Sequence, residues 1–216
     1  MKITDVAKLD IPFEFGCDDD CMETVEMDMV FEQLDDTVET KWGASKFVIL
    51  SDDWKDVVKI PFNGGFWWEQ DDEDEDGGKY IFNEFITKDY CAEEAAIYAD
   101  AVKHGVAQFF AKTVYGGMTN DGITPYYISE RVCNFYDKCD KCKIASKDSL
   151  EKAKKAKSEI CFEWLAMAYE WYGEDAVNAL LKFIELEEIG DFHSGNVGFR
   201  ADGSPVILDY SGFHEP

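Results

Sequence analysis

Ile-Gly-Asp-Phe-His-Ser-Gly-Asn-Val-Gly-Phe, at residues 189–199, is the stretch that decides the fold of this 216-residue sequence, together with Val-Ile-Leu-Asp-Tyr-Ser-Gly at 206–212. Asn196 follows Asp191 by five residues, and Asp209 ends an apolar run that is predicted to be a strand. Phosphoryl transfer needs one carboxylate to orient or deprotonate the attacking hydroxyl, and oxygen ligands to hold Mg²⁺ against the nucleotide phosphates. The two stretches supply these residue types in close succession.

Both stretches resemble the protein-kinase-like superfamily, and most closely its aminoglycoside-phosphotransferase and atypical-kinase branches. The catalytic loop of those branches reads Asp-Leu-His-Pro-Gly-Asn, and residues 191–196 read Asp-Phe-His-Ser-Gly-Asn. The Asp-Phe-Gly metal motif of the superfamily corresponds to Asp-Tyr-Ser at 209–211. The resemblance implies that Asp191 is the catalytic base and that Asn196 and Asp209 are ligands of Mg²⁺.

Three further side chains complete the expected catalytic set. The resemblance implies that His193 orients the catalytic loop through hydrogen bonds, whereas Mg²⁺ itself prefers oxygen ligands. Lys59, in Val-Val-Lys-Ile at 57–60, resembles the lysine that the superfamily places on its third strand to neutralise the α- and β-phosphates. A helical glutamate holds that lysine in the superfamily. We assign this role to Glu94, with Glu93 as the alternative, because the phase of the helix decides between them.

Two segments of the N-terminal half are expected to contact the nucleotide. Gly-Ala-Ser-Lys-Phe-Val at 43–48 resembles the second half of a glycine-rich loop, although it contains only one glycine, so we expect weaker phosphate binding by its backbone amides. Tyr-Ile-Ser-Glu-Arg-Val at 127–132 resembles the strand and hinge that hold adenine through backbone groups. The expected nucleotide-contacting residues are Gly43, Ser45, Val48, Lys59, Glu130 and Val132.

The predicted fold is of the α+β class, a two-lobed protein-kinase-like fold with a minimal C-terminal lobe. Residues 1–40 form an acidic N-terminal segment without assigned elements. Residues 41–130 form the N-terminal lobe, with an acidic insert at 63–88 that includes six successive carboxylates at 71–76. Residues 131–216 form the helical C-terminal lobe, with the catalytic loop at 189–198 and the metal motif at 206–212.

The pattern of apolar residues and capping residues predicts the secondary structure. Asp89 is a candidate N-cap, and Gly105 a candidate stop, for one helix. The inner face of that helix is predicted to carry Ala95, Tyr98, Ala99 and Val102. We expect strands at 46–50, 56–62, 124–132 and 205–209, and helices at 90–104, 148–172 and 173–188.

The composition limits the class of protein and of partner. There are 46 acidic and 21 basic residues, a net charge of −25, and 46% of the residues are hydrophobic with 15% aromatic, which excludes a disordered acidic tail. No window of uncharged apolar residues is long enough to span a membrane. No basic patch of useful size is visible, so we expect no direct binding of nucleic acid. We also expect no membrane binding, and we expect a cytoplasmic protein.

The seven cysteines indicate reduced thiols, since their number is odd and no secretory signal precedes them. A structural Zn²⁺ held by Cys17, Cys21, Cys139 and Cys142 is the disfavoured alternative, because it requires two distant segments to meet.

Two functions remain open at this point. The first is an ATP- and Mg²⁺-dependent phosphotransferase with a hydroxyl acceptor. Because the sequence ends seven residues after Asp209, leaving no platform for peptide substrates, a small molecule or a surface of a partner protein is expected as the acceptor. The second is a catalytically weak or inactive kinase-like protein, a pseudokinase that acts by binding. It could mimic a nucleic acid or inhibit a basic partner protein, as small acidic proteins of phages and mobile elements do.

Overall fold

The computed structural model describes residues 1–70, 78–84, 89–134 and 145–211. It divides into two compact units, each considered by itself below. Unit 1 comprises Met1–Glu93 and Val114–Ser129, and unit 2 comprises Glu94–Thr113 and Glu130–Pro216. Helices and strands occur in both units, and β1 with β2, β2 with β3, and β9 with β10 pair in antiparallel fashion, so the class is α+β.

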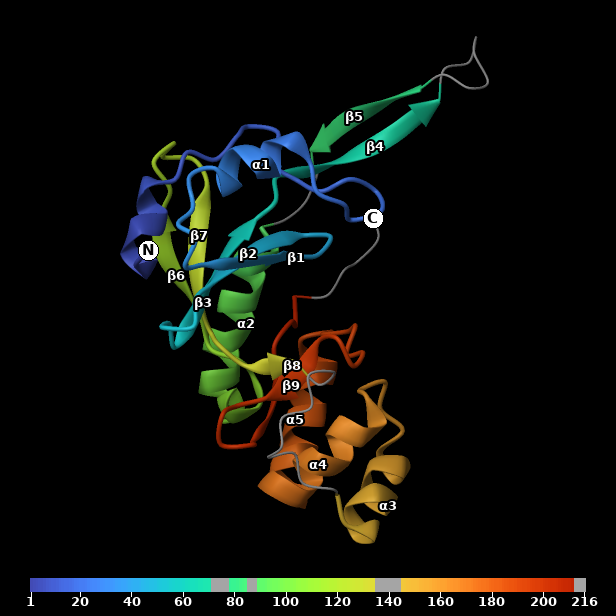
Figure 1. Ribbon diagram of the computed structural model, residues 1–216. Helices are drawn as coiled ribbons and strands as arrows, with labels where there is room; N and C mark the ends of the chain where they lie inside the picture. Colours follow the sequence, from blue (N-terminus) through green and yellow to red (C-terminus); the bar gives the residue numbers. More distant parts are fainter. Residues whose placement is uncertain (71–77, 85–88, 135–144, 212–216) are drawn as a thin grey trace. The chain divides into compact units, whose positions relative to one another are not determined.

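A five-stranded sheet forms the centre of unit 1 (Figure 1). Its strand order is β1-β2-β3-β7-β6. Of the two strands that follow helix α2 in the sequence, β7 lies beside β3 and β6 lies at the edge of the sheet. Strands β2 and β3 confirm the strands predicted at 46–50 and 56–62, and their antiparallel pairing places Val48 opposite Lys59. The strands are β1 (Glu39–Trp42), β2 (Lys46–Leu50), β3 (Asp56–Pro61), β6 (Thr113–Met118) and β7 (Pro125–Glu130).

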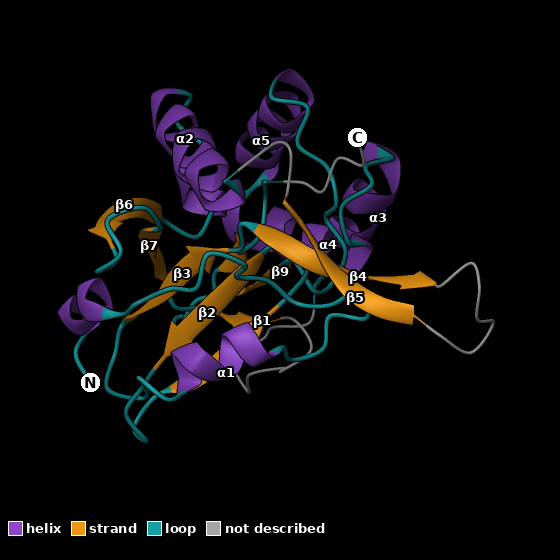
Figure 2. Ribbon diagram, turned by 90° about the horizontal axis from the view of Figure 1, so that it is seen from above, coloured by secondary structure: helices purple, strands orange, loops and turns teal. Residues whose placement is uncertain are grey.

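Residues 1–40 contribute to the core of unit 1. They contain a 3₁₀ helix (Ile3–Lys8) and α1 (Val25–Phe31), which lies close to β1 and β2 in Figure 2. Thr24 caps α1, because its hydroxyl accepts a hydrogen bond from the backbone N–H of Met27 at 3.3 Å. This acidic segment is therefore packed structure. Its fully buried side chains join Phe47, Val58 and Ile60 in one cluster, and they include Val6, Phe15, Met27 and Val30.

A separate two-stranded hairpin follows β3 in unit 1. It consists of β4 (Gly64–Gln70) and β5 (Gly78–Glu84), paired from Gly64 opposite Glu84 to Gln70 opposite Gly78. These two strands lie within the insert 63–88 and were not predicted from the sequence. The acidic run 71–76 lies outside the described residues.

Unit 2 combines helices with a small three-stranded sheet of order β10-β9-β8. Trp164 is fully buried at the centre of its core, and its Nε1–H donates to the carbonyl of Gly198 on β9 at 3.1 Å. Strand β10 confirms the strand predicted at 205–209, and it pairs with β9 in a hairpin between Asn196 and Asp209. The elements are α2 (Tyr90–Lys103), a 3₁₀ turn (Ala107–Phe109), β8 (Cys133–Asn134), α3 (Lys147–Ala156), α4 (Phe162–Tyr172), α5 (Glu174–Leu186), β9 (Val197–Phe199) and β10 (Pro205–Ile207).

Helix α2 has the predicted ends but not the predicted inner face. Asp89 caps it by accepting from the N–H of Ala92 at 2.9 Å, and Gly105 follows it with a φ of +71°. Half of the predicted inner face is wrong: Ala99 and Val102 are exposed, whereas Ala95 and Tyr98 are partly buried and Tyr98 packs against the core of unit 2. The buried positions of α2 are Tyr90, Cys91, Glu94, Ile97 and Ala101, and the glutamate among them breaks the apolar pattern.

The helix predicted over 148–172 is in fact two helices, α3 and α4. Lys157 ends α3 in the left-handed conformation, with a φ of +52°, and the chain resumes a helix only at Phe162. The segment 94–113, expected in the N-terminal lobe, is grouped with unit 2. The segment belongs to unit 2 because Ile97, Ala101 and Phe110 pack in the same core as Trp164.

Candidate functional site

The loop that follows α5 holds Asp191 and Asn196 against each other. Asp191 adopts the left-handed backbone conformation with a φ of +60°, which Asp tolerates better than most residues. The amide Nδ2 of Asn196 donates to the backbone carbonyl of Asp191 at 2.8 Å and to its carboxylate Oδ2 at 3.1 Å. Because its nitrogen faces Asp191, the atom that Asn196 can offer to a cation is its amide oxygen.

Asp209 lies next to Asn196 in unit 2. The carbonyl of Asn196 accepts from the N–H of Leu208 at 3.0 Å and from that of Asp209 at 3.4 Å. The β9–β10 hairpin between them closes this loop, so residues 13 apart in the sequence become neighbours. Ser211 also donates its hydroxyl to the carboxylate Oδ1 of Asp209 at 3.5 Å. The structure thus brings Asp191, Asn196 and Asp209 together.

His193 is integrated into the same loop. Its Nδ1 accepts from the N–H of Gly195 at 2.9 Å, so the neutral imidazole carries its proton on Nε2. That Nε2 lies 3.8 Å from the carboxylate Oδ1 of Asp191. The carbonyl of His193 in turn accepts from the N–H of Asn196 at 3.0 Å. These bonds fit an orienting role.

Substitution of Gly195 by alanine tests this role of His193. A Cβ at residue 195 would lie 2.5 Å from Cε1 of the imidazole, so the ring must move and the bond to Nδ1 must break. We expect Gly195→Ala to lower the free energy of unfolding by about 1 kcal/mol, the contribution of a typical hydrogen bond. We also expect the ¹⁵N spectrum of the His193 ring to lose the pattern of an Nε2–H tautomer. Retention of that pattern in the variant would contradict the assignment.

Gly190→Ala is the matched control for this variant. Gly190 lies in the same segment, and a Cβ there would meet no atom within 4 Å. We expect its imidazole spectrum to be that of the wild type.

Two buried charged side chains occupy the positions assigned to the phosphate-binding pair. Lys59 lies on β3 in unit 1 with 6% of its surface exposed. Glu94 lies on α2 in unit 2 with none exposed, and its Oε2 accepts from the hydroxyl of Thr113 at 3.3 Å. Glu93 is only partly buried. Lysine and glutamate side chains are usually exposed, and those that are buried usually have partners. The burial of Lys59 and Glu94 is therefore unusual for residues of these types.

The turn between β1 and β2 contains the other nucleotide-contacting residues expected in unit 1. The N–H of Gly43 donates to the carbonyl of Lys46 at 3.2 Å and closes the turn. The carbonyl of Ser45 accepts from the N–H of Phe62 at 3.0 Å. Val48 follows on β2, opposite Lys59. The turn is therefore adjacent in the sheet to the strand that carries the lysine.

The segment 130–132 was expected to hold adenine through its backbone groups, but one of these groups already has a hydrogen-bond partner. The N–H of Glu130 donates to the carbonyl of Lys112 at 2.8 Å, so of its backbone groups the carbonyl is the one suited to a ligand. The carboxylate of Glu130 pairs with Arg200, whose Nε lies 2.8 Å from Oε1. Val132 is partly buried.

Arg200, Asn134 and Tyr210 support the site, and sequence reasoning missed the first two and gave the third no role. Besides Glu130, Arg200 donates to the carbonyls of Gln108 and Phe110 at 2.8 and 2.9 Å. Asn134 donates from Nδ2 to the carbonyl of Gly195 at 2.8 Å. Tyr210, fully buried, donates its hydroxyl to the carbonyl of Ala111 at 2.7 Å. These partners are distant in the sequence, so no local pattern could have identified them.

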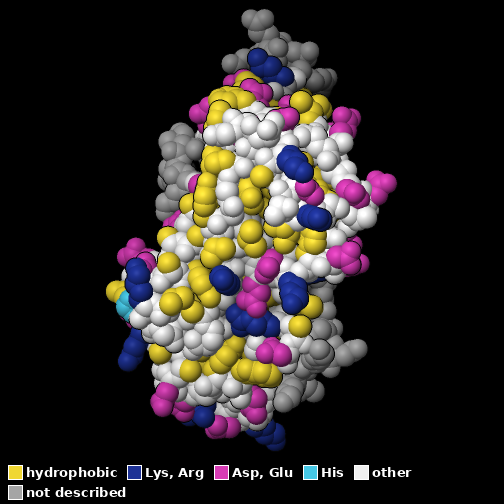
Figure 3. All heavy atoms as spheres, turned by 90° about the vertical axis from the view of Figure 1, so that its left-hand side faces the viewer, with side chains coloured by type: hydrophobic (Ala, Val, Ile, Leu, Met, Phe, Trp, Pro, Cys, Tyr) yellow, Lys and Arg dark blue, Asp and Glu magenta, His cyan; other side chains and the backbone are white. Residues whose placement is uncertain are grey.

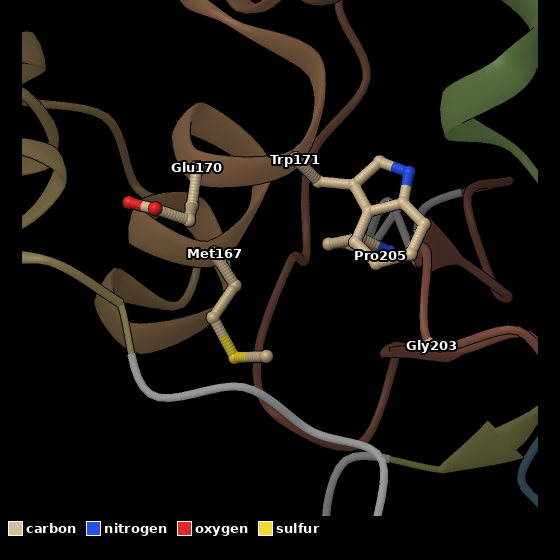
Figure 4. A pocket seen from close by; sticks show the side chains of 5 residues that line it. All are labelled: Met167, Glu170, Trp171, Gly203 and Pro205. Carbon is tan, nitrogen blue, oxygen red and sulfur yellow. The ribbon is translucent and has the colours of Figure 1, made fainter.

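A small pocket in unit 2 lies between α4 and the β9–β10 turn (Figure 4). Its empty space is about 240 Å³, including open solvent, and apolar atoms form most of its walls. The carboxylate of Glu170 points away from the space in Figure 4 and accepts hydrogen bonds from Ser146 and Ser149. This pocket contains none of the predicted site residues. Its lining residues are Met167, Glu170, Trp171, Gly203 and Pro205.

The cysteines lend no support to the zinc alternative within the described residues. Cys17 is buried and Cys21 exposed, and both are free thiols. Burial and the neighbouring Cys21 raise the pKa of Cys17 to about 12, so its thiol is protonated at neutral pH. Cys139 and Cys142 lie outside the described residues. In the part of the chain that is described, no group of three or more His, Cys, Asp or Glu side chains is arranged to hold a metal.

Comparison with protein-family models and with curated proteins finds no match to this chain. In the described ranges, every helix is too short or too polar to cross a bilayer. The function must therefore be argued from the geometry and chemistry of the site.

Proposed function

We propose that the chain is an ATP- and Mg²⁺-dependent phosphotransferase of the protein-kinase-like type, acting on a hydroxyl acceptor. The observation that carries the proposal is the convergence of Asp191, Asn196 and Asp209 at the start and end of one β-hairpin in unit 2. A carboxylate for the acceptor hydroxyl and two oxygen ligands for a hard cation are the groups that phosphoryl transfer requires.

The donor set fits Mg²⁺. The amide oxygen of Asn196 and the carboxylate of Asp209 are hard oxygen ligands, and Mg²⁺ commonly takes one or two such protein ligands and completes its coordination with water and phosphates. When bound, the ion would neutralise charge on the transferred phosphoryl group.

Asp191 is assigned to the acceptor. Its carboxylate is exposed, and its Oδ2 is oriented by the amide of Asn196. A hydroxyl donating to this carboxylate would be aligned for attack on the γ-phosphorus of ATP. The carboxylate would take the hydroxyl proton as the new O–P bond forms and the bond from the γ-phosphorus to the bridging oxygen breaks, releasing ADP. His193 and Gly195 keep the loop in the conformation that aims Asp191.

The remaining assignments rest on the resemblance and on the order of elements. The lysine lies on β3 of the five-stranded sheet, the glutamate on the next helix, and Glu130 at the end of β7, the second strand after that helix. We assign Lys59 to the α- and β-phosphates and Glu94 to holding Lys59. We assign the backbone of 130–132 to adenine, and the turn that contains Gly43 and Ser45 to the phosphates.

A thermal-shift panel tests nucleotide binding. We expect millimolar Mg·ATP to raise the melting temperature of the wild type by about 3–8 °C, since a ligand at 10–100 times its Kd stabilises by about 1–3 kcal/mol. ATP with EDTA should give a much smaller shift, and Asp209→Asn should abolish the Mg²⁺-dependent part. Glu185→Gln, at an exposed position on α5, removes the same charge and should respond like the wild type. No shift of the wild type with Mg·ATP would refute the proposal.

A further inference from the structure

The β4–β5 hairpin of unit 1 exposes aromatic side chains that the proposed function does not use. Trp67, Trp68 and Tyr80 are exposed by 50%, 50% and 49%. In Figure 1 the hairpin extends away from the five-stranded sheet of unit 1. Large aromatic groups exposed side by side on a soluble protein are typical of interaction sites.

One face of the hairpin is an ordered aromatic stripe. The register places Phe66 opposite Phe82 and Trp68 opposite Tyr80, two residues further along each strand, so all four side chains lie on the same face. The ring centroids are 5.1 Å apart in the first pair and 5.2 Å in the second. A Cβ at Gly78 would clash with the indole of Trp68, so this glycine gives the ring its space. The Trp68 ring therefore packs edge-on against Tyr80 and over the backbone at Gly78.

Carboxylates lie beside this stripe. A bridge pairs Asp18 with Phe66, and the N–H of Phe66 donates to the carbonyl of Cys17 at 2.9 Å, which fixes the acidic segment along β4. Asp18 shapes the turn by accepting from the N–H groups of Asp20 and Met22. Asp19 and Asp20 are exposed. The pKa of the Tyr80 hydroxyl is raised by partial desolvation and by Asp19, Asp18 and Asp20, as expected for a ring close to these carboxylates.

The net charge of the molecule limits which kinds of molecule can bind to the stripe. A second copy would carry the same net charge of −25, and a nucleic acid would bring phosphates, so both are repelled. Figure 3 shows one face of the molecule, on which acidic and basic side chains are interspersed. Aromatic rings next to carboxylates suit guanidinium groups, which stack on the rings and pair with the acids.

We propose that the stripe of Trp68 and Tyr80, with Asp19 and Asp20 beside it, is a docking site for an arginine-rich segment of a basic partner protein. This inference is independent of phosphotransferase activity, and catalysis by the other unit could be present or absent without changing it.

Binding of a fluorescent nona-arginine peptide at 150 mM NaCl, followed by anisotropy, tests the docking site. The double variant Trp68→Ala/Tyr80→Ala keeps the net charge, and we expect it to bind the peptide at least fivefold more weakly. The aromatic variant Trp68→Phe/Tyr80→Phe should stay within twofold of the wild type, and circular dichroism should show that both variants are folded. The matched control is Tyr115→Ala/Ile123→Ala, which removes side chains of the same unit that are exposed by 58% and 76%. It should also bind like the wild type.

The acidic part is tested with Asp19→Asn/Asp20→Asn against Glu32→Gln/Asp36→Asn, an exposed pair elsewhere in unit 1. We expect at least threefold weaker binding for the first pair and less than a twofold change for the second. Equal effects of the two pairs, or wild-type binding by Trp68→Ala/Tyr80→Ala, would overturn the proposal in favour of general charge attraction. Self-association of the wild type that Trp68→Ala/Tyr80→Ala abolishes would overturn it in favour of a second copy.

Discussion

Asp191→Asn is expected to lower the rate of ADP formation from Mg·ATP by about 10²- to 10⁴-fold, the contribution typical of a general base. Asparagine tolerates the left-handed backbone of residue 191 and keeps an oxygen that can accept from Nδ2 of Asn196. The bond from Nδ2 to the backbone carbonyl of residue 191 is unaffected by any substitution there. The loop should therefore stay intact while the base is lost.

The affinity for Mg·ATP separates this loss from a failure to bind. Because Asp191 is assigned to the acceptor and not to the metal, we expect the Kd of Mg·ATP to change by less than about threefold, whereas Asp209→Asn should weaken it by at least an order of magnitude. ADP formation is measured with a panel of hydroxyl acceptors and with water. Wild-type rates in Asp191→Asn, or a wild type that forms no ADP with any acceptor although it binds Mg·ATP, would favour the binding-protein alternative.

Trp164→Ala is expected to destabilise unit 2 by about 3–5 kcal/mol, as large-to-small substitutions of buried tryptophan do. The side chain is fully buried among the helices, and its indole N–H satisfies the carbonyl of Gly198. Since Gly198 lies on β9, two residues after Asn196, the same substitution should loosen the hairpin that brings Asn196 to Asp209. Chemical denaturation monitored by circular dichroism measures the change.

Trp171→Ala is the matched control on the same helix. Its side chain is 40% exposed at the edge of the small pocket, so we expect a loss of about 1 kcal/mol or less. Trp164→Phe keeps most of the volume and leaves the Gly198 carbonyl without its donor, which should cost about 1–3 kcal/mol. Equal destabilisation by Trp164→Ala and Trp171→Ala would contradict the central position of Trp164.

Local patterns in the sequence were sufficient for several elements and for the core of the candidate site. Alternating and apolar runs bounded by turn residues predicted β2, β3 and β10, and a capping Asp with a terminal Gly predicted α2. The resemblance implied that Asp191, Asn196 and Asp209 share one site, and the tight β9–β10 hairpin makes Asn196 and Asp209 neighbours. These features depend on residues near in sequence.

Features that depend on tertiary packing were not predictable. The buried Glu94 interrupts the apolar pattern of α2, so the pattern indicated a neighbouring face. The break between α3 and α4 depends on a left-handed lysine, a conformation with no sequence signal when the residue is not Gly or Asn. The β4–β5 hairpin reads as a consecutive aromatic run, without the alternation that identifies a strand. Arg200 donates hydrogen bonds to Glu130 and Gln108, which lie 70 and 92 residues away in the sequence.

Paramagnetic broadening by Mn²⁺ tests the central claim, that a metal–nucleotide complex binds at Asn196 and Asp209, most directly. In ¹⁵N spectra, substoichiometric Mn²⁺ with ADP should broaden the side-chain amide of Asn196 and the backbone amide of Asp209, more strongly than Mn²⁺ alone. Asp209→Asn should abolish the nucleotide-dependent broadening. Broadening centred on other residues of the chain, or no dependence on nucleotide, would contradict the account.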